Sequence, residues 1–162
     1  MEAIGKLFRN ILCPIDFDAN SPAALEFAAQ IAQQTGARIC ILHVVPWTVA
    51  AVPIDASEVL AELKQSATKR LQQLADDKLH KRIAFEVVVT VASDPGAEVV
   101  RIANESKSNL VIMATHGRKG LSHLVLGSVA ERVVREAPCP VLTLRAKPQE
   151  VADPALVSHS TQ

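Results

Sequence analysis

Hydrophobic residues in this chain gather in five short runs, and the segments between the runs show helical periodicity. Several runs are nearly continuous in Val, Ile and Leu, which is typical of strands covered on both faces of a parallel sheet. The order βαβαβαβαβ, with right-handed crossovers, predicts a doubly wound α/β fold: one five-stranded parallel sheet with helices on both faces. The runs span residues 11–15, 39–45, 85–91, 110–113 and 141–144.

Two of the predicted helices have clear start signals. In the first, residues 23–35, Ser21 can cap the helix, Pro22 suits its first turn and Gly36 is placed to end it. The third opens at Asp94 and the proline that follows. The residues expected to face the core are Leu25, Ala28, Ile31 and Ala32 in the first, and Val99, Ile102 and Ala103 in the third.

The second and fourth helices are predicted from periodicity and charge. The second is long and amphipathic, and either Asp55 or Ser57 can cap it. The fourth begins with Ser128 as its cap and ends before Pro138. The apolar positions of the second recur every three or four residues: Leu60, Leu63, Ala67, Leu71 and Leu74.

The composition predicts one domain with an aliphatic core. The chain has 162 residues, of which 49% are hydrophobic, with one Trp, no Tyr and four Phe. That length is sufficient for one core without disulfides. Seventeen basic and seventeen acidic residues balance to a net charge of zero, which gives no electrostatic case for nucleic acid or an anionic membrane as partner.

Cysteine usage and the absence of long apolar stretches point to the cytoplasm. Cys13, Cys40 and Cys139 are an odd number without C-x-x-C spacing, which argues against a disulfide framework or a zinc site. Thiols inside apolar runs favour a reducing compartment. The first residues resemble no signal peptide, and no run approaches 18 apolar residues, so we expect no membrane span.

The segment from residue 113 to residue 129 carries the chemistry. An apolar run ends at Met113, a loop containing Gly117 follows, and Gly127 and Ser128 open a helical pattern. A glycine loop leading to a helix N-terminus is an arrangement that binds phosphates, because free N–H groups and the helix dipole attract anions. The segment contains neither a Walker P-loop nor a Rossmann fingerprint.

This segment resembles the ATP-binding motif of the universal stress protein family: Gly, two residues, Gly, nine residues, Gly, then Ser or Thr. Gly117, nine residues, Gly127 and Ser128 match, whereas Ala114 stands in place of the first glycine. The resemblance continues through residues 128–142 and returns at residues 11–18 and 42–45. It covers roughly residues 5–146.

The resemblance implies strand order 3-2-1-4-5 and an adenine nucleotide at the carboxyl ends of strands one and four. Asp16 would bond the adenosine part, the backbone of Val44 would pair with the adenine edge, and Met113 would line the pocket. The helix start at Gly127 would hold the β- and γ-phosphates. The full set of implied nucleotide-binding residues is Pro14, Ile15, Asp16, Val44, Met113, Ala114, Gly117, Arg118, Gly127, Ser128 and Val129.

Most of these residues also have an ordinary structural explanation. Asp16 can bond nearby loop N–H groups, Val44 and Met113 can be core residues, and the Gly127 region can be a plain helix start. Arg118 can be a solvated loop charge. His43, His116 and His123 match no zinc spacing, and His43 is expected to be a hydrogen-bonded structural residue.

Three functions compete at this stage. The first is an ATP-dependent stress-response switch with at most slow hydrolysis, in which Mg²⁺ is bound mainly through the phosphates and an unknown protein partner reads the state. The second is a structural dimer without nucleotide, which Ala114 favours. The third is an ATP hydrolase or phosphotransferase, although no catalytic residue is evident in the sequence.

The resemblance also implies a homodimer and a short tail. Relatives commonly pair their last strand across a two-fold axis, which here begins at Pro140 and ends at Arg145. The alternative is an edge strand protected by Arg145 and the residues that follow. We expect the domain to occupy residues 1–146 and a flexible tail to occupy residues 147–162.

Overall fold

The computed structural model describes residues 7–47, 57–79, 83–115 and 127–145, and these form five strands alternating with four helices. The predicted boundary at residue 146 and the predicted tail lie outside the described residues. The elements are β1 (Asn10–Pro14), α2 (Ser21–Thr35), β2 (Arg38–Pro46), α3 (Ser57–Lys78), β3 (Phe85–Ala92), α4 (Pro95–Glu105), β4 (Leu110–Thr115), α5 (Ser128–Glu136) and β5 (Val141–Arg145).

The strands form one parallel sheet in the order β3-β2-β1-β4-β5, which confirms the predicted fold. The chain places β2 and β3 on one side of β1 and then β4 and β5 on its other side, so the direction in which strands are added reverses between β1 and β4. In open α/β sheets, ligands bind at such a switch point, beyond the carboxyl ends of the strands.

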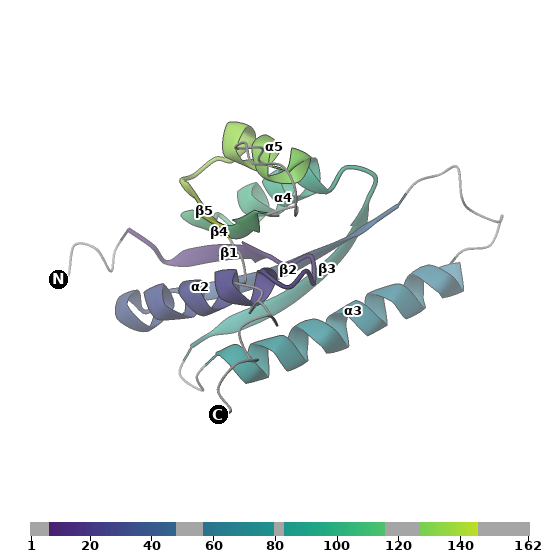
Figure 1. The fold of residues 1–162 in the computed structure, drawn as a ribbon, viewed down its shortest axis with the longest axis horizontal. Coiled ribbons are helices and arrows are strands. Elements are labelled where there is room, and N and C mark those ends of the chain that lie inside the picture. Colours follow the sequence, from purple (N-terminus) through teal and green to yellow (C-terminus); the bar gives the residue numbers. More distant parts are fainter. Residues whose placement is uncertain (1–6, 48–56, 80–82, 116–126, 146–162) are drawn as a thin grey trace, which may run out of the picture.

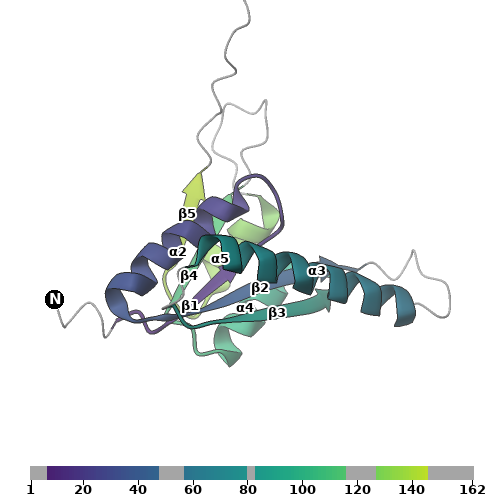
Figure 2. The same ribbon diagram turned by 90° about the horizontal axis from the view of Figure 1, so that it is seen from below.

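Helices cover both faces of the sheet and enclose two separate apolar cores (Figures 1 and 2). On one face α2 and α3 pack against alternate strand residues such as Ile11, Ile41 and Ile112. On the other face α4 and α5 pack against Leu12, Val111 and their neighbours. Burial on both faces explains why the strands appear in the sequence as continuous apolar runs.

The ends of α2 show which local signals decided the fold. Gly36 adopts a left-handed φ of 71° and its N–H donates to the carbonyl of Ala32, which ends the helix as predicted. The cap prediction at the other end was wrong. The cap is Asn20, and Ser21 is the first helical residue, buried with 2% exposure.

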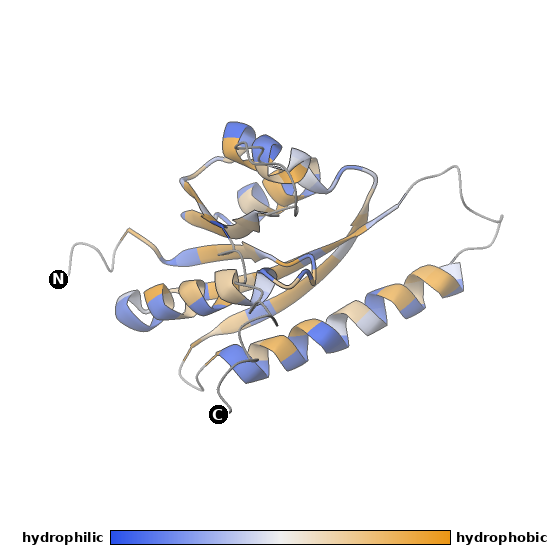
Figure 3. Ribbon diagram, viewed as in Figure 1, coloured by the Kyte–Doolittle hydropathy of each residue, from blue (hydrophilic) through white to orange (hydrophobic). Residues whose placement is uncertain are grey.

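The long helix α3 is less buried than its periodicity predicted. Of its residues, Ala67, Leu71 and Ala75 are buried, whereas Leu60 is only half-buried and Leu63 is 44% exposed. Figure 3 shows apolar residues along the whole helix, and its N-terminal part extends past α2. The apolar periodicity of α3 therefore continues beyond the part of the helix that is buried.

The three cysteines differ in accessibility, and a thiol-labelling experiment is expected to show it. Burial, and after it the neighbouring Cys40, raises the pKa of the Cys13 thiol, and burial raises the pKa of Cys40 to about 12. Cys139 is partly exposed. Because thiolates are the reactive form, we expect a disulfide reagent at pH 8 to label one thiol, Cys139, rapidly in the native protein and all three after unfolding. Rapid labelling of two or three native thiols would contradict this burial.

Candidate functional site

The carboxyl ends of β1, β2 and β4 meet at the switch point and bring several predicted site residues to one edge. β1 pairs with β2 through Pro14 and Leu42, and Ile15 continues this pairing by donating its N–H to the Leu42 carbonyl at 2.7 Å. β1 also pairs with β4 in parallel. Continuing both registers places Asp16 level with Val44 on one side and with Thr115 on the other.

Asp16 is exposed and lies in a tightly hydrogen-bonded loop before α2. Its Oδ1 accepts the N–H of Asp18 at 3.0 Å and the hydroxyl hydrogen of Ser21. The Asp16 N–H donates in turn to the Ser21 hydroxyl at 3.2 Å. This explains why Ser21 is buried and does not act as a helix cap. The carboxylate thus has the local role that the sequence left open, and its direction is fixed by the loop.

Phe17, inside this loop, has a φ of 61°. The left-handed region costs a residue with a Cβ about 1–2 kcal/mol, so the surrounding contacts must hold it there. The Phe17 ring lies 4.5 Å from the His43 ring. His43 is half-buried, and its Nδ1 donates to the carbonyl of Ile15 at 2.7 Å. His43 is therefore a hydrogen-bonded structural histidine, as predicted.

The start of α5 lies at the predicted phosphate position, but its cap differs from the prediction. Gly127 is the N-cap residue and Ser128 is the first helical residue, so the assignment of Ser128 as cap was wrong. Gly127 has φ −60° and ψ 153°, which any residue can adopt, and a Cβ added to it would meet none of the described residues within 4 Å. The fold itself does not require a glycine here.

Among the described residues, no side chain caps the start of α5. Gly127 itself has no side chain, and its carbonyl accepts the N–H of Glu131 at 2.9 Å. The N–H groups of the first turn have no intrahelical acceptor in any α-helix. Ser128 is exposed beside them and Val129 is half-buried against the α4–α5 core. The helix start thus combines open space with donors that favour an anion.

The remaining predicted pocket residues divide between the two faces of the sheet. Met113 is buried in the α4–α5 core, and Val44 packs against the same core. Ala114 packs against the opposite, α2–α3 core. Within the described chain, left-handed φ values occur only at Phe17, Gly36 and Lys107, so Ala114 does not need the freedom of glycine. The departure from the motif therefore does not distort β4.

An ion-pair cluster fixes α5 against α4. Asp94 caps α4 by accepting the N–H of Ala97 at 3.0 Å, and its other carboxylate oxygen pairs with Arg132 of α5. Arg132 also pairs with Glu136 at 3.1 Å, and this hydrogen bond lowers the pKa of the Glu136 carboxyl. A Cβ on Gly96 would lie 3.1 Å from side-chain carbons of Arg132, so a larger residue would require Arg132 to shift by a few tenths of an ångström. The sequence indicated the Asp94 cap but not its partner.

Part of the predicted phosphate loop lies outside the described residues. This part contains Gly117 and Arg118, together with His116 and His123. Among the described residues there is no cluster of three His, Cys, Asp or Glu side chains that could hold a metal ion, and no helix there is both long and apolar enough to cross a membrane.

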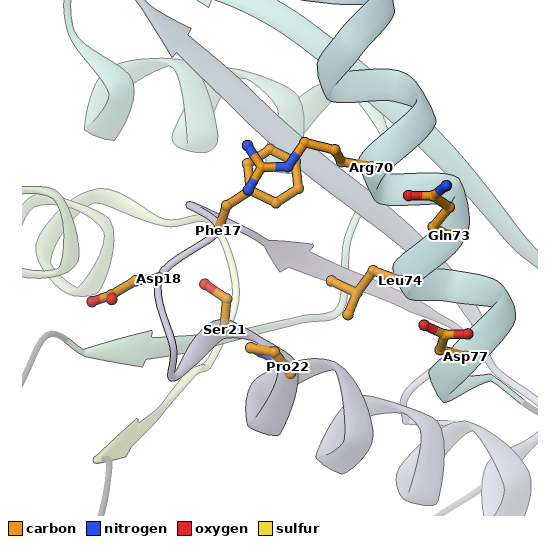
Figure 4. Close-up of a pocket in the computed structure, with 8 residues that line it drawn as sticks. All are labelled: Phe17, Asp18, Ser21, Pro22, Arg70, Gln73, Leu74 and Asp77. Carbon is orange, nitrogen blue, oxygen red and sulfur yellow. The ribbon is translucent and has the colours of Figure 1, made fainter.

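A hollow of about 260 Å³ opens beside Phe17 between α2 and α3, on the side of the sheet away from α5 (Figure 4).

Comparison with known proteins gives a consistent result along the chain. Residues 7–145 match the universal stress protein family. The universal stress protein MJ0531 of Methanocaldococcus jannaschii is 32% identical over 153 residues, which cover 89% of this chain and 86% of that protein. The solved structure of MJ0577, from the same organism, has a TM-score of 0.75 and 25% identity, covering 87% of this chain and 98% of that chain.

Two more distant solved structures contain nucleotides. A universal stress protein from Archaeoglobus fulgidus in complex with dAMP has a TM-score of 0.56 and 19% identity, covering 85% of this chain and 98% of that chain. Another universal stress protein, in complex with cAMP, has a TM-score of 0.59 and 20% identity, covering 85% and 97%. At these identities the likeness establishes the shared fold, and the bound nucleotides are properties of those proteins.

Proposed function

Because this chain belongs to the universal stress protein family, we propose that it binds an adenine nucleotide, ATP in particular, at the carboxyl ends of β1 and β4. The observation that carries the proposal is the start of α5, where no described residue fills the space beside Gly127 and no described side chain caps the first N–H groups. That glycine is not required by the backbone, so a ligand that must come close to it is the better explanation. Nucleotide complexes of homologues support the same ligand class.

The proposed assignment divides the ligand between the two ends of the site. The end of β1 and the residues after it, Pro14, Ile15 and Asp16, take the ribose and adenine. The backbone of Val44 lies at the adenine edge, and Met113 and Ala114 contribute from the end of β4. The start of α5 takes the phosphates, with Gly117 and Arg118 from the preceding loop. Mg²⁺ is then held mainly by phosphate oxygens, which suits an ion that keeps few protein ligands.

The consequence of binding is proposed to be a switch rather than rapid catalysis. Asp16 is the acidic side chain in the assigned residues, and its Oδ1 is occupied by Asp18 and Ser21. Phosphoryl transfer requires a positioned base or water-orienting group together with charge compensation. We therefore expect ATP to change the surface read by a protein partner, with at most slow hydrolysis. The buried thiols fit a cytoplasmic location.

The first test is calorimetric titration of the nucleotide-stripped protein with ATP and Mg²⁺, beside AMP. We expect micromolar binding of ATP and clearly weaker binding of AMP, because the helix start contributes only when β- and γ-phosphates are present. Equal affinities would refute the phosphate assignment. The absence of heat at millimolar ATP would refute nucleotide binding and leave a partner-binding dimer as the function.

A homodimer through β5 is proposed on a separate observation. Val141, Leu142 and Leu144 are only half-buried at the edge of the sheet, and an apolar edge strand readily pairs with another strand. We expect light scattering to give twice the chain mass of 17.4 kDa. Thr143→Glu would place like charges near the proposed two-fold axis and is expected to yield monomer. A wild-type mass of one chain would refute the dimer.

A further inference from the structure

The strained loop residue Phe17 is held from two sides by contacts that the nucleotide assignment does not use. Its ring meets the His43 ring with centroids 4.5 Å apart and planes tilted by 46°. The guanidinium carbon of Arg70, in the middle of α3, lies 3.8 Å from the centre of the same ring. Figure 4 shows the guanidinium lying over the Phe17 ring. A cation over an aromatic face is attracted by the ring quadrupole.

The backbone of Phe17 decides where Asp16 points. The Asp16 carboxylate accepts the N–H of Asp18, two residues on, at 3.0 Å, and Phe17 is the residue between them. Closing this turn with a φ of 61° aims the Asp18 N–H back at the carboxylate. If Phe17 relaxed to negative φ, this hydrogen bond would be lost, and the carboxylate, still bonded to the Ser21 hydroxyl, would lose one of the contacts that fix its direction.

His43 connects the same ring to the end of β1. Its Nδ1 donates to the Ile15 carbonyl at 2.7 Å while its ring contacts Phe17. The backbone before Asp16 and the backbone after it are therefore both tied to one aromatic contact. Arg70 is the part of this arrangement that comes from a distant element, the helix α3.

We infer that Arg70 is a positioning residue for the adenosine side of the nucleotide site, acting through the ring of Phe17 on the direction of the Asp16 carboxylate. The part of this inference that concerns the nucleotide rests on the proposed function. The part that concerns the geometry of the loop does not. Arg70 is exposed and does not itself touch the site at α5, which lies on the other face of the sheet. Its effect should therefore be the same for every nucleotide with the same adenosine part.

The test compares Arg70→Gln with the matched control Lys69→Gln. Both replace an exposed α3 cation by a neutral residue of similar helix propensity, but neighbouring residues on a helix point about 100° apart. Arg70→Gln is expected to weaken AMP and ATP binding by the same factor of about two to five, the range that an exposed cation–π contact supports. Arg70→Lys is expected to restore part of the affinity, and Lys69→Gln to change nothing.

A local measurement separates positioning from a general loss of stability. Amide exchange of Asp18, measured by NMR, is expected to accelerate by a similar factor in Arg70→Gln and to stay unchanged in Lys69→Gln. If wild-type protein binds no nucleotide, the proposed function fails and so does the ligand part of this inference, while the Asp18 exchange still decides whether Arg70 holds the turn. Unchanged affinity and exchange in Arg70→Gln would overturn the inference.

A second pair of variants tests the strain directly. Phe17→Ala keeps the cost of the left-handed backbone but loses both ring contacts, and is expected to weaken nucleotide binding about tenfold or more. Phe17→Gly loses the same contacts without that cost, so it is expected to bind at least about threefold more tightly than Phe17→Ala. Equal affinities of the two variants would show that the φ of Phe17 does not matter for the site.

Discussion

Substituting valine for Gly127 is expected to reduce ATP affinity by at least about a hundredfold while the thermal unfolding temperature falls by only a few degrees, because valine is a poorer helix N-cap than glycine. The two charge-assisted hydrogen bonds that a phosphate would make at the helix start are each worth about 1.5–3 kcal/mol, and blocking both gives this factor. The described part of the protein does not clash with the new Cβ, because a Cβ at this position meets none of the described residues within 4 Å and φ is −60°. Calorimetry with ATP and a melting curve measure the two quantities.

A graded series makes this prediction specific. Gly127→Ala adds only a methyl group and is expected to fall between wild type and Gly127→Val. AMP, which has no β- or γ-phosphate, is expected to lose far less affinity than ATP. An unchanged ATP affinity in Gly127→Val would remove the start of α5 from the site, and an equal loss for AMP and ATP would indicate that the substitution distorts the adenosine side as well.

The largest effect on stability is expected at Leu71. This residue is fully buried and is the one large side chain that α3 buries completely, between the small residues Ala67 and Ala75. Leu71→Ala removes that contact and leaves a cavity under the helix, which typically costs 2–5 kcal/mol. We expect chemical denaturation to show a free energy of unfolding lower by about this amount.

Leu63 provides the matched control for this variant. It lies on the same helix and is 44% exposed, so Leu63→Ala should change the free energy of unfolding by no more than about 0.5 kcal/mol. If Leu63→Ala were as destabilising as Leu71→Ala, the N-terminal part of α3 would have to be covered in solution. Equal mild effects of both variants would mean that α3 is anchored elsewhere.

The sheet was predictable because its signal is local and repeated. A run such as residues 39–45 is apolar except for His43, since β2 has neighbours on both edges and helices on both faces. Gly36 likewise ended α2 through its own backbone freedom. Strand order followed from the family resemblance, which covers almost the whole chain, whereas the handedness of the crossovers indicated only a doubly wound sheet.

The helix caps were the least predictable local feature, for a physical reason. A serine before an apolar period can bond the helix N–H groups, but Ser21 instead bonds Asp16 and lies one residue further inside the helix. Ser128 is likewise the first residue of α5, and glycine is the cap. Whether a hydroxyl turns toward its own helix or toward another loop depends on tertiary neighbours that spacing does not encode.

Contacts between distant elements could not be read from the sequence at all. Arg70 has no local feature that separates it from Lys69, yet it lies over a phenylalanine 53 positions earlier, the difference between 70 and 17. Arg132 looks like an ordinary surface residue of an amphipathic helix, yet it crosses Gly96 to reach Asp94. Both contacts bear on the candidate site, one through the turn at Asp16 and one through the placement of α5.

The two cores on opposite faces of the sheet give the proposed ligand a mechanical role. The turn at Asp16 is attached to the layer of α2 and α3, whereas the start of α5 is attached to the layer of α4 and α5. A nucleoside would not reach the start of α5, whereas a triphosphate would connect that helix to the turn at Asp16. The number of phosphates would then decide whether α5 is tied to the turn, and that difference is one that a partner molecule can sense.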